Sequence, residues 1–231
     1  MAELIVALDV PGREEAVRVI RTIGPAVDFY KIGLELFCSG GPAVVDEVKR
    51  LGKRVFLDLK LHDIPRTVAR AVASCSRMGV DLLTLHASGC RAMVEAAREA
   101  ADAAGPAAPK LLAVTVLTSL DAADLSSLGI ARGPAEQVEA LGRLACGAGA
   151  DGLVCSPREA AALRSALGPA ALLATPGIRP SDGAWGDQKR VATPRDAVRA
   201  GATHLVVGRP VVAAADPRAA AEAIATEMRS A

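Results

Sequence analysis

Aromatic residues are scarce in this sequence. Phe, Tyr and Trp together make up 2% of the 231 residues, whereas hydrophobic residues as a whole make up 51%. A core must therefore be filled by Val, Leu, Ile and Ala rather than by stacked rings, because few other apolar side chains are present. Branched aliphatic side chains fill the interior of parallel αβ barrels in this way.

An excess of either charge is also missing, since 27 Lys and Arg residues face 26 Asp and Glu residues. This balance excludes the broad basic surface expected of a protein that binds nucleic acid or an acidic membrane. No apolar run approaches the roughly 20 residues that a membrane-spanning helix needs. We therefore expect neither nucleic-acid nor membrane partners, and any functional positive charge must be local.

Paired cysteine spacings are absent as well. None of the five cysteines has the spacing of a zinc or redox motif, and no signal peptide is recognisable ahead of the first apolar run. Disulfides are rare in the reducing cytosol, so we expect a cytoplasmic protein with free thiols that have no catalytic role. These thiols belong to Cys38, Cys75, Cys90, Cys146 and Cys155.

Ligand and nucleophile patterns are few. His62, His86 and His204 do not form a metal-ligand set, and we expect His86 to be a structural residue at a strand end. Ser119 and Ser156 have no partner histidine at a recognisable spacing, which argues against a serine nucleophile. The sequence thus predicts no metal and no cofactor.

Short aliphatic runs alternate with Ala-rich helical stretches along the whole chain, which is typical of repeated βα units. No GxGxxG motif follows the first run, so a dinucleotide-binding sheet loses its main support. Length and pattern predict an α/β protein, a (β/α)8 TIM barrel in a single domain over residues 1–231. The expected strands are residues 4–9, 29–33, 55–60, 82–86, 111–117, 152–156, 172–177 and 204–208, and helices include 13–23, 65–78, 157–167 and 217–228.

Charged residues fall at the ends of these expected strands, where barrels of this kind carry their chemistry. Asp9 ends the first, Lys31 lies in the second, Asp58 and Lys60 end the third, and Arg209 follows the eighth. Side chains alternate along a strand, so Asp58 and Lys60 should face the barrel axis together. Their leucine neighbours at 57, 59 and 61 should face the helices.

Burial of charged groups costs several kcal/mol each unless they are paired, which favours a functional site over a structural one. A purely structural ion-pair network remains the alternative for Asp58 and Lys60, and more so for Asp9. Asp63, just ahead of Pro65, has two equal interpretations, because it could also cap the helix that begins there.

A phosphate site is indicated after the seventh and eighth strands. Gly177 and Arg179 follow one strand, and Gly208 and Arg209 follow the other. Glycine permits close approach of the backbone, arginine can bind phosphate with two hydrogen bonds, and these two loops commonly hold phosphate in such barrels. The long connection 179–193, which contains Trp185, is expected to be a lid.

Residues 58–67 read DLKLHDIPRT and carry a D-x-K-x-x-D motif. With residues 8–9, 30–33, 114–119, 176–179, 186–188 and 208–209, the chain closely resembles the bacterial orotidine 5′-phosphate decarboxylase family over nearly its whole length. The motif alone also occurs in sister barrels such as 3-keto-gulonate-6-phosphate decarboxylase. The surrounding HDIPxT and the later GDQ favour the first family.

The resemblance implies a cofactor-free decarboxylation that produces UMP. Lys60 would protonate C6 of the pyrimidine, Asp58 would lie beside the departing carboxylate, and Lys31 would complete a charge network with Asp9. Asp63 and Thr67 would reach the substrate of the neighbouring subunit in a homodimer. The catalytic residues so implied are Lys60, Asp58, Asp63 and Lys31.

The same resemblance assigns the substrate contacts. Thr118 would bind the pyrimidine edge, Gln188 would bridge from the phosphate towards the base, and Arg179, Gly208 and Arg209 would hold the phosphate. The full substrate-binding set is Asp9, Lys31, Asp58, Leu59, Lys60, Leu61, His62, Asp63, Ile64, Pro65, Arg66, Thr67, Thr118, Arg179, Gln188, Gly208 and Arg209.

Two other functions are alternatives. The sister decarboxylase uses magnesium, and its branch is expected to carry an acidic ligand where this chain has Lys31. A catalytically silent sensor of phosphorylated ligands would be expected to lack the Asp58 and Lys60 pair, which is present here.

Overall fold

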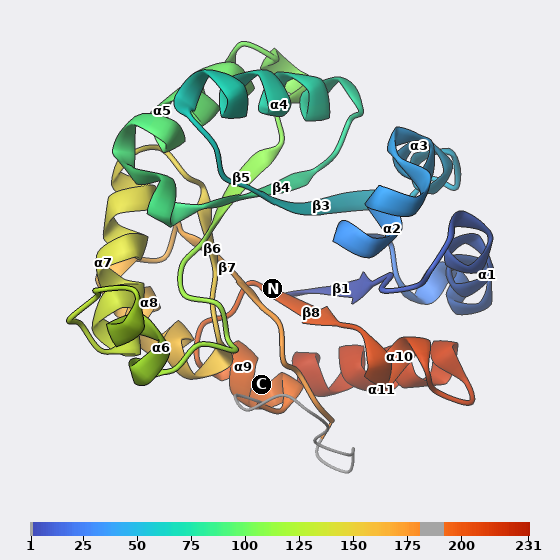
Figure 1. Cartoon of the computed structure of the whole chain (residues 1–231). Coiled ribbons are helices and arrows are strands. Elements are labelled where there is room, and N and C mark those ends of the chain that lie inside the picture. Colours follow the sequence, from blue (N-terminus) through green and yellow to red (C-terminus); the bar gives the residue numbers. More distant parts are fainter. Residues whose placement is uncertain (1, 181–191) are drawn as a thin grey trace.

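The computed structural model describes residues 2–180 and 192–231. Its eight strands are all parallel and pair in chain order, and β8 pairs with β1 to close the barrel (Figure 1). This confirms the predicted (β/α)8 fold. The strands are β1 Glu3–Ala7, β2 Phe29–Ile32, β3 Arg54–Leu61, β4 Leu82–His86, β5 Lys110–Val114, β6 Gly152–Val154, β7 Leu172–Thr175 and β8 His204–Val207.

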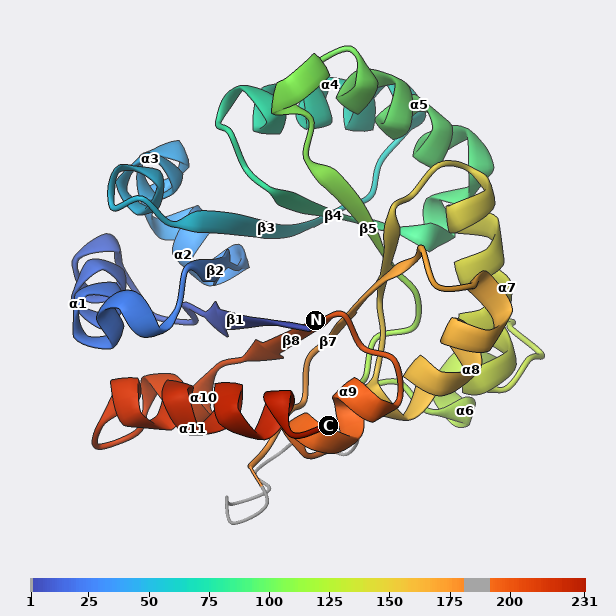
Figure 2. The ribbon, with the colours of Figure 1, turned by 180° about the vertical axis from the view of Figure 1, so that it is seen from behind.

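Helices surround the barrel as an outer layer, which Figures 1 and 2 show from opposite sides. Proline occupies the first turn of several of them, because its fixed φ suits that turn and its missing N–H is not needed there. The α-helices are α1 Arg13–Ile23, α2 Leu34–Gly40, α3 Pro42–Arg50, α4 Pro65–Arg77, α5 Cys90–Asp102, α6 Ala122–Ser127, α7 Pro134–Gly147, α8 Pro157–Leu167, α9 Pro194–Arg199, α10 Arg209–Val212 and α11 Pro217–Arg229. Short 3-10 turns are η1 Gly24–Ala26, η2 Ala87–Gly89 and η3 Gly105–Ala107.

The core has two apolar layers. One lies between strands and helices, and a smaller one fills the barrel interior with Ile5, Ala7, Phe29, Phe56, Leu82, Leu112, Ala174 and Val206. The interior is mostly aliphatic, as predicted, but two of the few aromatic rings are also used there. Arg54 covers the Phe29 ring at 4.1 Å, so the amino-terminal end of the barrel is closed by a cation and an aromatic ring.

Most strands end earlier than the sequence predicted. β5 ends at Val114 rather than at residue 117, and β1 ends at Ala7. The N–H of Leu8 still donates to the Lys31 carbonyl at 2.9 Å, so Asp9 lies just beyond the last bond to β2. Apolar residues continue beyond the last residue that hydrogen-bonds to a neighbouring strand. The sequence does not show which residue that is.

No helix within residues 2–180 and 192–231 is both long and apolar enough to cross a membrane. All five cysteines lie in these ranges and are free.

Candidate active site

A pocket of about 160 Å³ opens at the carboxyl ends of the strands. Lys31, Asp58, Lys60 and Thr118 supply its polar groups. The remaining wall is mainly apolar and comes from β3 and from the strands and loops across the barrel. It comprises Phe56, Val114, Val116, Leu117, Val154, Cys155, Pro176 and Val206. One side of the pocket is therefore charged and the other is apolar, which suits a flat ligand with one polar edge.

The charged side is a chain of alternating charges from three neighbouring strands. Lys31 Nζ lies 2.8 Å from Asp9 Oδ1 and 3.8 Å from Asp58 Oδ2. Lys60 Nζ lies 2.8 Å from the same Asp58 Oδ2. Asp58 and Lys31 are nearly buried, with side chains 13% and 11% exposed, whereas Asp9 lies at the rim at 58%. The structure thus brings together four of the five charged residues that the sequence placed at strand ends, all except Arg209.

Gly33 allows the outer part of this chain to form. A Cβ at this position would lie 2.8 Å from Lys31 Nζ and 3.3 Å from Asp9 Oδ1. A residue with a Cβ would therefore require the Lys31 ammonium to shift from this position. The glycine that follows β2 is therefore part of the site without contacting the pocket.

Strand β3 does not keep the regular alternation of side chains expected from its sequence. Its register with β4 shifts between Leu57 and Leu61, and Lys60 has φ +52°, which is uncommon for a residue with a Cβ. Asp58 and Lys60 do line the pocket together, but through this irregular segment. Leu59 and Leu61 pack against the outer core, as predicted.

Thr84 in β4 is a polar partner of Asp58 and Lys60 that the sequence did not indicate. Its hydroxyl donates to Asp58 Oδ1 at 2.9 Å and accepts from the backbone N–H of Lys60 at 2.8 Å. A lone buried threonine in an aliphatic strand gives no signal in the sequence, because its role depends on what lies opposite it in β3.

Residues 62–67 form an exposed segment at the mouth of the barrel. Asp63 does not cap α4, so that interpretation is wrong: the N-cap residue is Ile64 and has no side-chain cap bond. The Asp63 carboxylate instead accepts from the adjacent N–H of Ile64 at 2.7 Å. Asp63 and Thr67 line a second pocket of about 350 Å³ beside α4. The neighbouring Arg66 is exposed at the start of the same helix.

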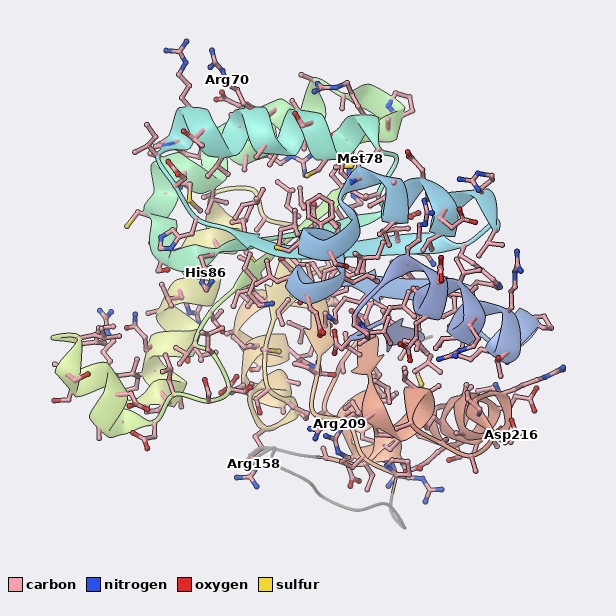
Figure 3. All side chains as sticks on the ribbon, turned by 45° about the vertical axis from the view of Figure 1, so that its right-hand side comes forward. Arg70, Met78, His86, Arg158, Arg209 and Asp216 are labelled. Carbon is pink, nitrogen blue, oxygen red and sulfur yellow. The ribbon has the colours of Figure 1, made fainter. Side chains whose placement is uncertain are left out.

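His86, labelled in Figure 3, ends β4 as predicted. Its ring centroid lies 5.3 Å from that of His62. Burial lowers the pKa of His86 below its usual value, and the nearby charges of His62 and Lys60 lower it further. Asp58 opposes this effect. His86 is thus biased towards the neutral form beside the charged chain.

The predicted phosphate residues lie after β7 and β8. Gly177 has φ +78°, a conformation that favours glycine, and the N–H of Arg179 bonds to the Ala192 carbonyl at 3.0 Å. Gly208 immediately precedes Arg209, which begins α10 and is exposed (Figure 3). Gln188 and most of the expected lid lie outside the described residues.

No group of three or more His, Cys, Asp or Glu side chains that could hold a metal ion occurs in the described part of the chain.

Comparison with known proteins shows what this arrangement belongs to. Residues 2–224 match the model of the orotidine 5′-phosphate decarboxylase / HUMPS family. The chain belongs to this family. It is 54% identical to orotidine 5′-phosphate decarboxylase of Rhodopseudomonas palustris strain HaA2 over 99% of this chain and 95% of that protein. Identity to the enzyme of the same name from Anaeromyxobacter sp. strain K is 56%, over 95% of each chain.

A solved structure of orotidine 5′-phosphate decarboxylase from Lactobacillus acidophilus superposes with a TM-score of 0.89 at 39% identity, covering 99% of each chain. Membership of the orotidine 5′-phosphate decarboxylase / HUMPS family confirms the resemblance seen at residues 58–67, and the solved structure confirms the barrel. The roles of the individual site residues remain predictions.

Proposed function

We propose that this chain decarboxylates orotidine 5′-phosphate to UMP and CO₂ in pyrimidine biosynthesis, without a cofactor. The observation that carries the proposal is the pair of the nearly buried Asp58 and the partly buried Lys60, 2.8 Å apart at the wall of a mainly apolar pocket. In the proposed step, the bond between C6 and its carboxylate breaks and the electron pair stays on C6. The Lys60 ammonium then supplies the proton, and the resulting amine regains one from solvent.

The pocket suits a planar pyrimidine. Its apolar wall can contact the ring, Thr118 can hydrogen-bond to the polar edge, and the charged residues lie where the carboxylate would leave. A preorganised ammonium stabilises negative charge as it develops, and in a site shielded from water this effect is large. We assign this role to Lys60, and assign to Lys31 and Asp9 the task of holding the network and the ribose.

Asp58 has a smaller share in the mechanism. A carboxylate about 4 Å from the substrate carboxylate is repelled by roughly 4 kcal/mol at an effective dielectric near 20, which is worth about 10³ in rate if the repulsion is fully relieved. Such a factor is too small to be the whole mechanism. The larger share must come from charge stabilisation at C6 and from binding energy at the distant phosphate.

For the phosphate we propose Arg179, Gly208 and Arg209, together with Gln188. The two arginines follow adjacent strands at the end of the barrel where such folds commonly bind phosphate. Their contacts should affect the chemical step as well as binding, because binding energy from a non-reacting group can lower the barrier.

We also propose a homodimer in which Asp63 and Thr67 reach the neighbouring subunit's substrate. Support comes from the exposure of residues 62–67, including Ile64, an apolar residue 67% exposed. We further propose that residues 1–231 act as one catalytic domain in the cytosol, where the five free thiols would persist.

The magnesium-dependent sister reaction is less compatible with this geometry. The Lys31 ammonium lies between Asp9 and Asp58, where it is paired with both carboxylates and would repel a divalent cation. The decisive experiment is to incubate the purified protein with orotidine 5′-phosphate and EDTA and to follow the loss of pyrimidine absorbance. We expect full turnover with chelator present, and none in Lys60→Ala. Loss of turnover that magnesium restores would overturn the proposal.

A further inference from the structure

We propose that Thr84 is a positioning residue for the decarboxylation: its one hydroxyl fixes both the Asp58 carboxylate and the backbone that carries Lys60. This inference rests on the proposed function, in which these two residues act on the substrate. Thr84 is fully buried and is absent from the lining of the pocket, so it can act only through its neighbours.

The need for Thr84 arises from the pairing of β3 with β4. Leu57 is opposite Leu83 and Leu61 is opposite Leu85, so three residues of β3, numbers 58–60, face the single residue Thr84. A bulge of this kind leaves backbone groups without their usual partners across the ladder. The Lys60 N–H is one of these groups, and the Thr84 hydroxyl accepts its hydrogen bond at 2.8 Å.

The same hydroxyl orients the carboxylate. A threonine hydroxyl donates one hydrogen bond and can accept others, so it can serve Lys60 and Asp58 at once. It donates to Asp58 Oδ1 at 2.9 Å, which leaves Oδ2 to face Lys60 Nζ at 2.8 Å. Without this donor the carboxylate is held only through Oδ2, by the two lysines, and Oδ1 loses the contact that sets its orientation.

Lys60 adopts a left-handed backbone conformation, with φ +52°. Non-glycine residues persist in such conformations only where the surrounding structure holds them, and they are concentrated at active sites. The bond from the Lys60 N–H to Thr84 is one contact that holds it here, and it acts directly on the Lys60 backbone. The direction in which the Lys60 side chain leaves the strand therefore depends on Thr84.

The test compares Thr84→Val with Thr84→Ser. Valine keeps the shape and removes both hydrogen bonds, whereas serine keeps the hydroxyl and loses only the methyl group. We expect Thr84→Val to lower kcat by roughly 10- to 100-fold, the effect of leaving buried polar groups unsatisfied at a reacting pair, while KM changes less than about three-fold. Thr84→Ser should keep kcat within about three-fold of the parent enzyme.

Thr115 provides a matched control, because its hydroxyl is also buried but has no hydrogen-bond partner among the described residues. Thr115→Val should leave kcat unchanged. Each variant is assayed well below its midpoint of thermal unfolding, and kcat is expressed per folded protein. A merely structural role for Thr84 would shift that midpoint and leave kcat intact.

Parallel assays of Lys60→Ala test the proposed decarboxylation separately from the role of Thr84. If Lys60→Ala is inactive and Thr84→Val keeps full kcat, the role of Thr84 is wrong while the proposed function stands. Near-normal turnover in Lys60→Ala would instead remove the proposed function. Should Thr84→Val not fold, the serine variant still decides, because a loss of kcat greater than about ten-fold in Thr84→Ser would show that the hydroxyl is not what matters.

Discussion

Asp58 and Lys60 should behave as one catalytic unit. At 2.8 Å the two charges attract each other by roughly 6 kcal/mol at an effective dielectric of about 20, before the cost of removing them from water. Contacting residues in double-mutant cycles show net coupling of about 0.5–3 kcal/mol. We therefore expect a coupling of about 2 kcal/mol in the activation free energy, which is a thirty-fold departure from additive effects on kcat.

The single variants should differ in character. Lys60→Ala removes the proton donor and the charge that opposes the carbanion, so kcat should fall by at least about 10³-fold with the fold intact. Asp58→Ala should also lower kcat. It should weaken binding of UMP little or even strengthen it, because UMP brings no carboxylate to be repelled.

The assay is steady-state decarboxylation by the parent, both single variants and the double variant, with UMP affinity measured by calorimetry. Circular dichroism checks that each variant is folded. If the increase in activation free energy of the double variant equals the sum of the two single increases within about 0.5 kcal/mol, the coupling is refuted. Near-normal kcat in Lys60→Ala would refute the assigned chemistry.

Three further outcomes are expected. Arg209→Ala should weaken substrate binding by about 2–3 kcal/mol through loss of a charge-assisted contact, and equal weakening of a substrate analogue without the phosphate would contradict that assignment. Hybrid dimers of Lys60→Ala and Asp63→Ala proteins should recover activity on mixing, and no recovery after demonstrated subunit exchange would count against shared sites. Burial lowers the pKa of His204, so the unfolded chain binds the proton at a higher pH than the folded chain does. Below the ordinary histidine pKa, the free energy of unfolding should therefore fall by up to about 1.4 kcal/mol per pH unit. His204→Gln should lose less stability than the parent between pH 7.5 and 5.5 in thermal unfolding, and identical losses would disprove this contribution.

The positions of the strands were predictable because parallel strands buried on both faces are nearly continuous apolar runs. Helix starts at Pro65, Pro157 and Pro217 were predictable because proline suits the first turn. The ends of the strands could not be predicted, and β5, which ends at Val114, is an example. A strand ends where its neighbour no longer offers hydrogen-bonding groups. The mostly apolar stretch itself continues past Thr115 to Leu117.

Within the candidate site, the sequence alone determined which charged groups stand at the ends of which strands. Barrel topology is a general rule, so it was enough to predict that Asp58, Lys60 and Lys31 meet at one pocket, although the regular alternation expected of β3 is broken. Only the tertiary structure decided how they meet. The β3 bulge, the bonds to Thr84 and the failure of Asp63 to cap α4 all depend on the register between strands and on local backbone geometry. Register is set by packing over the whole barrel, and no short stretch of sequence contains that information.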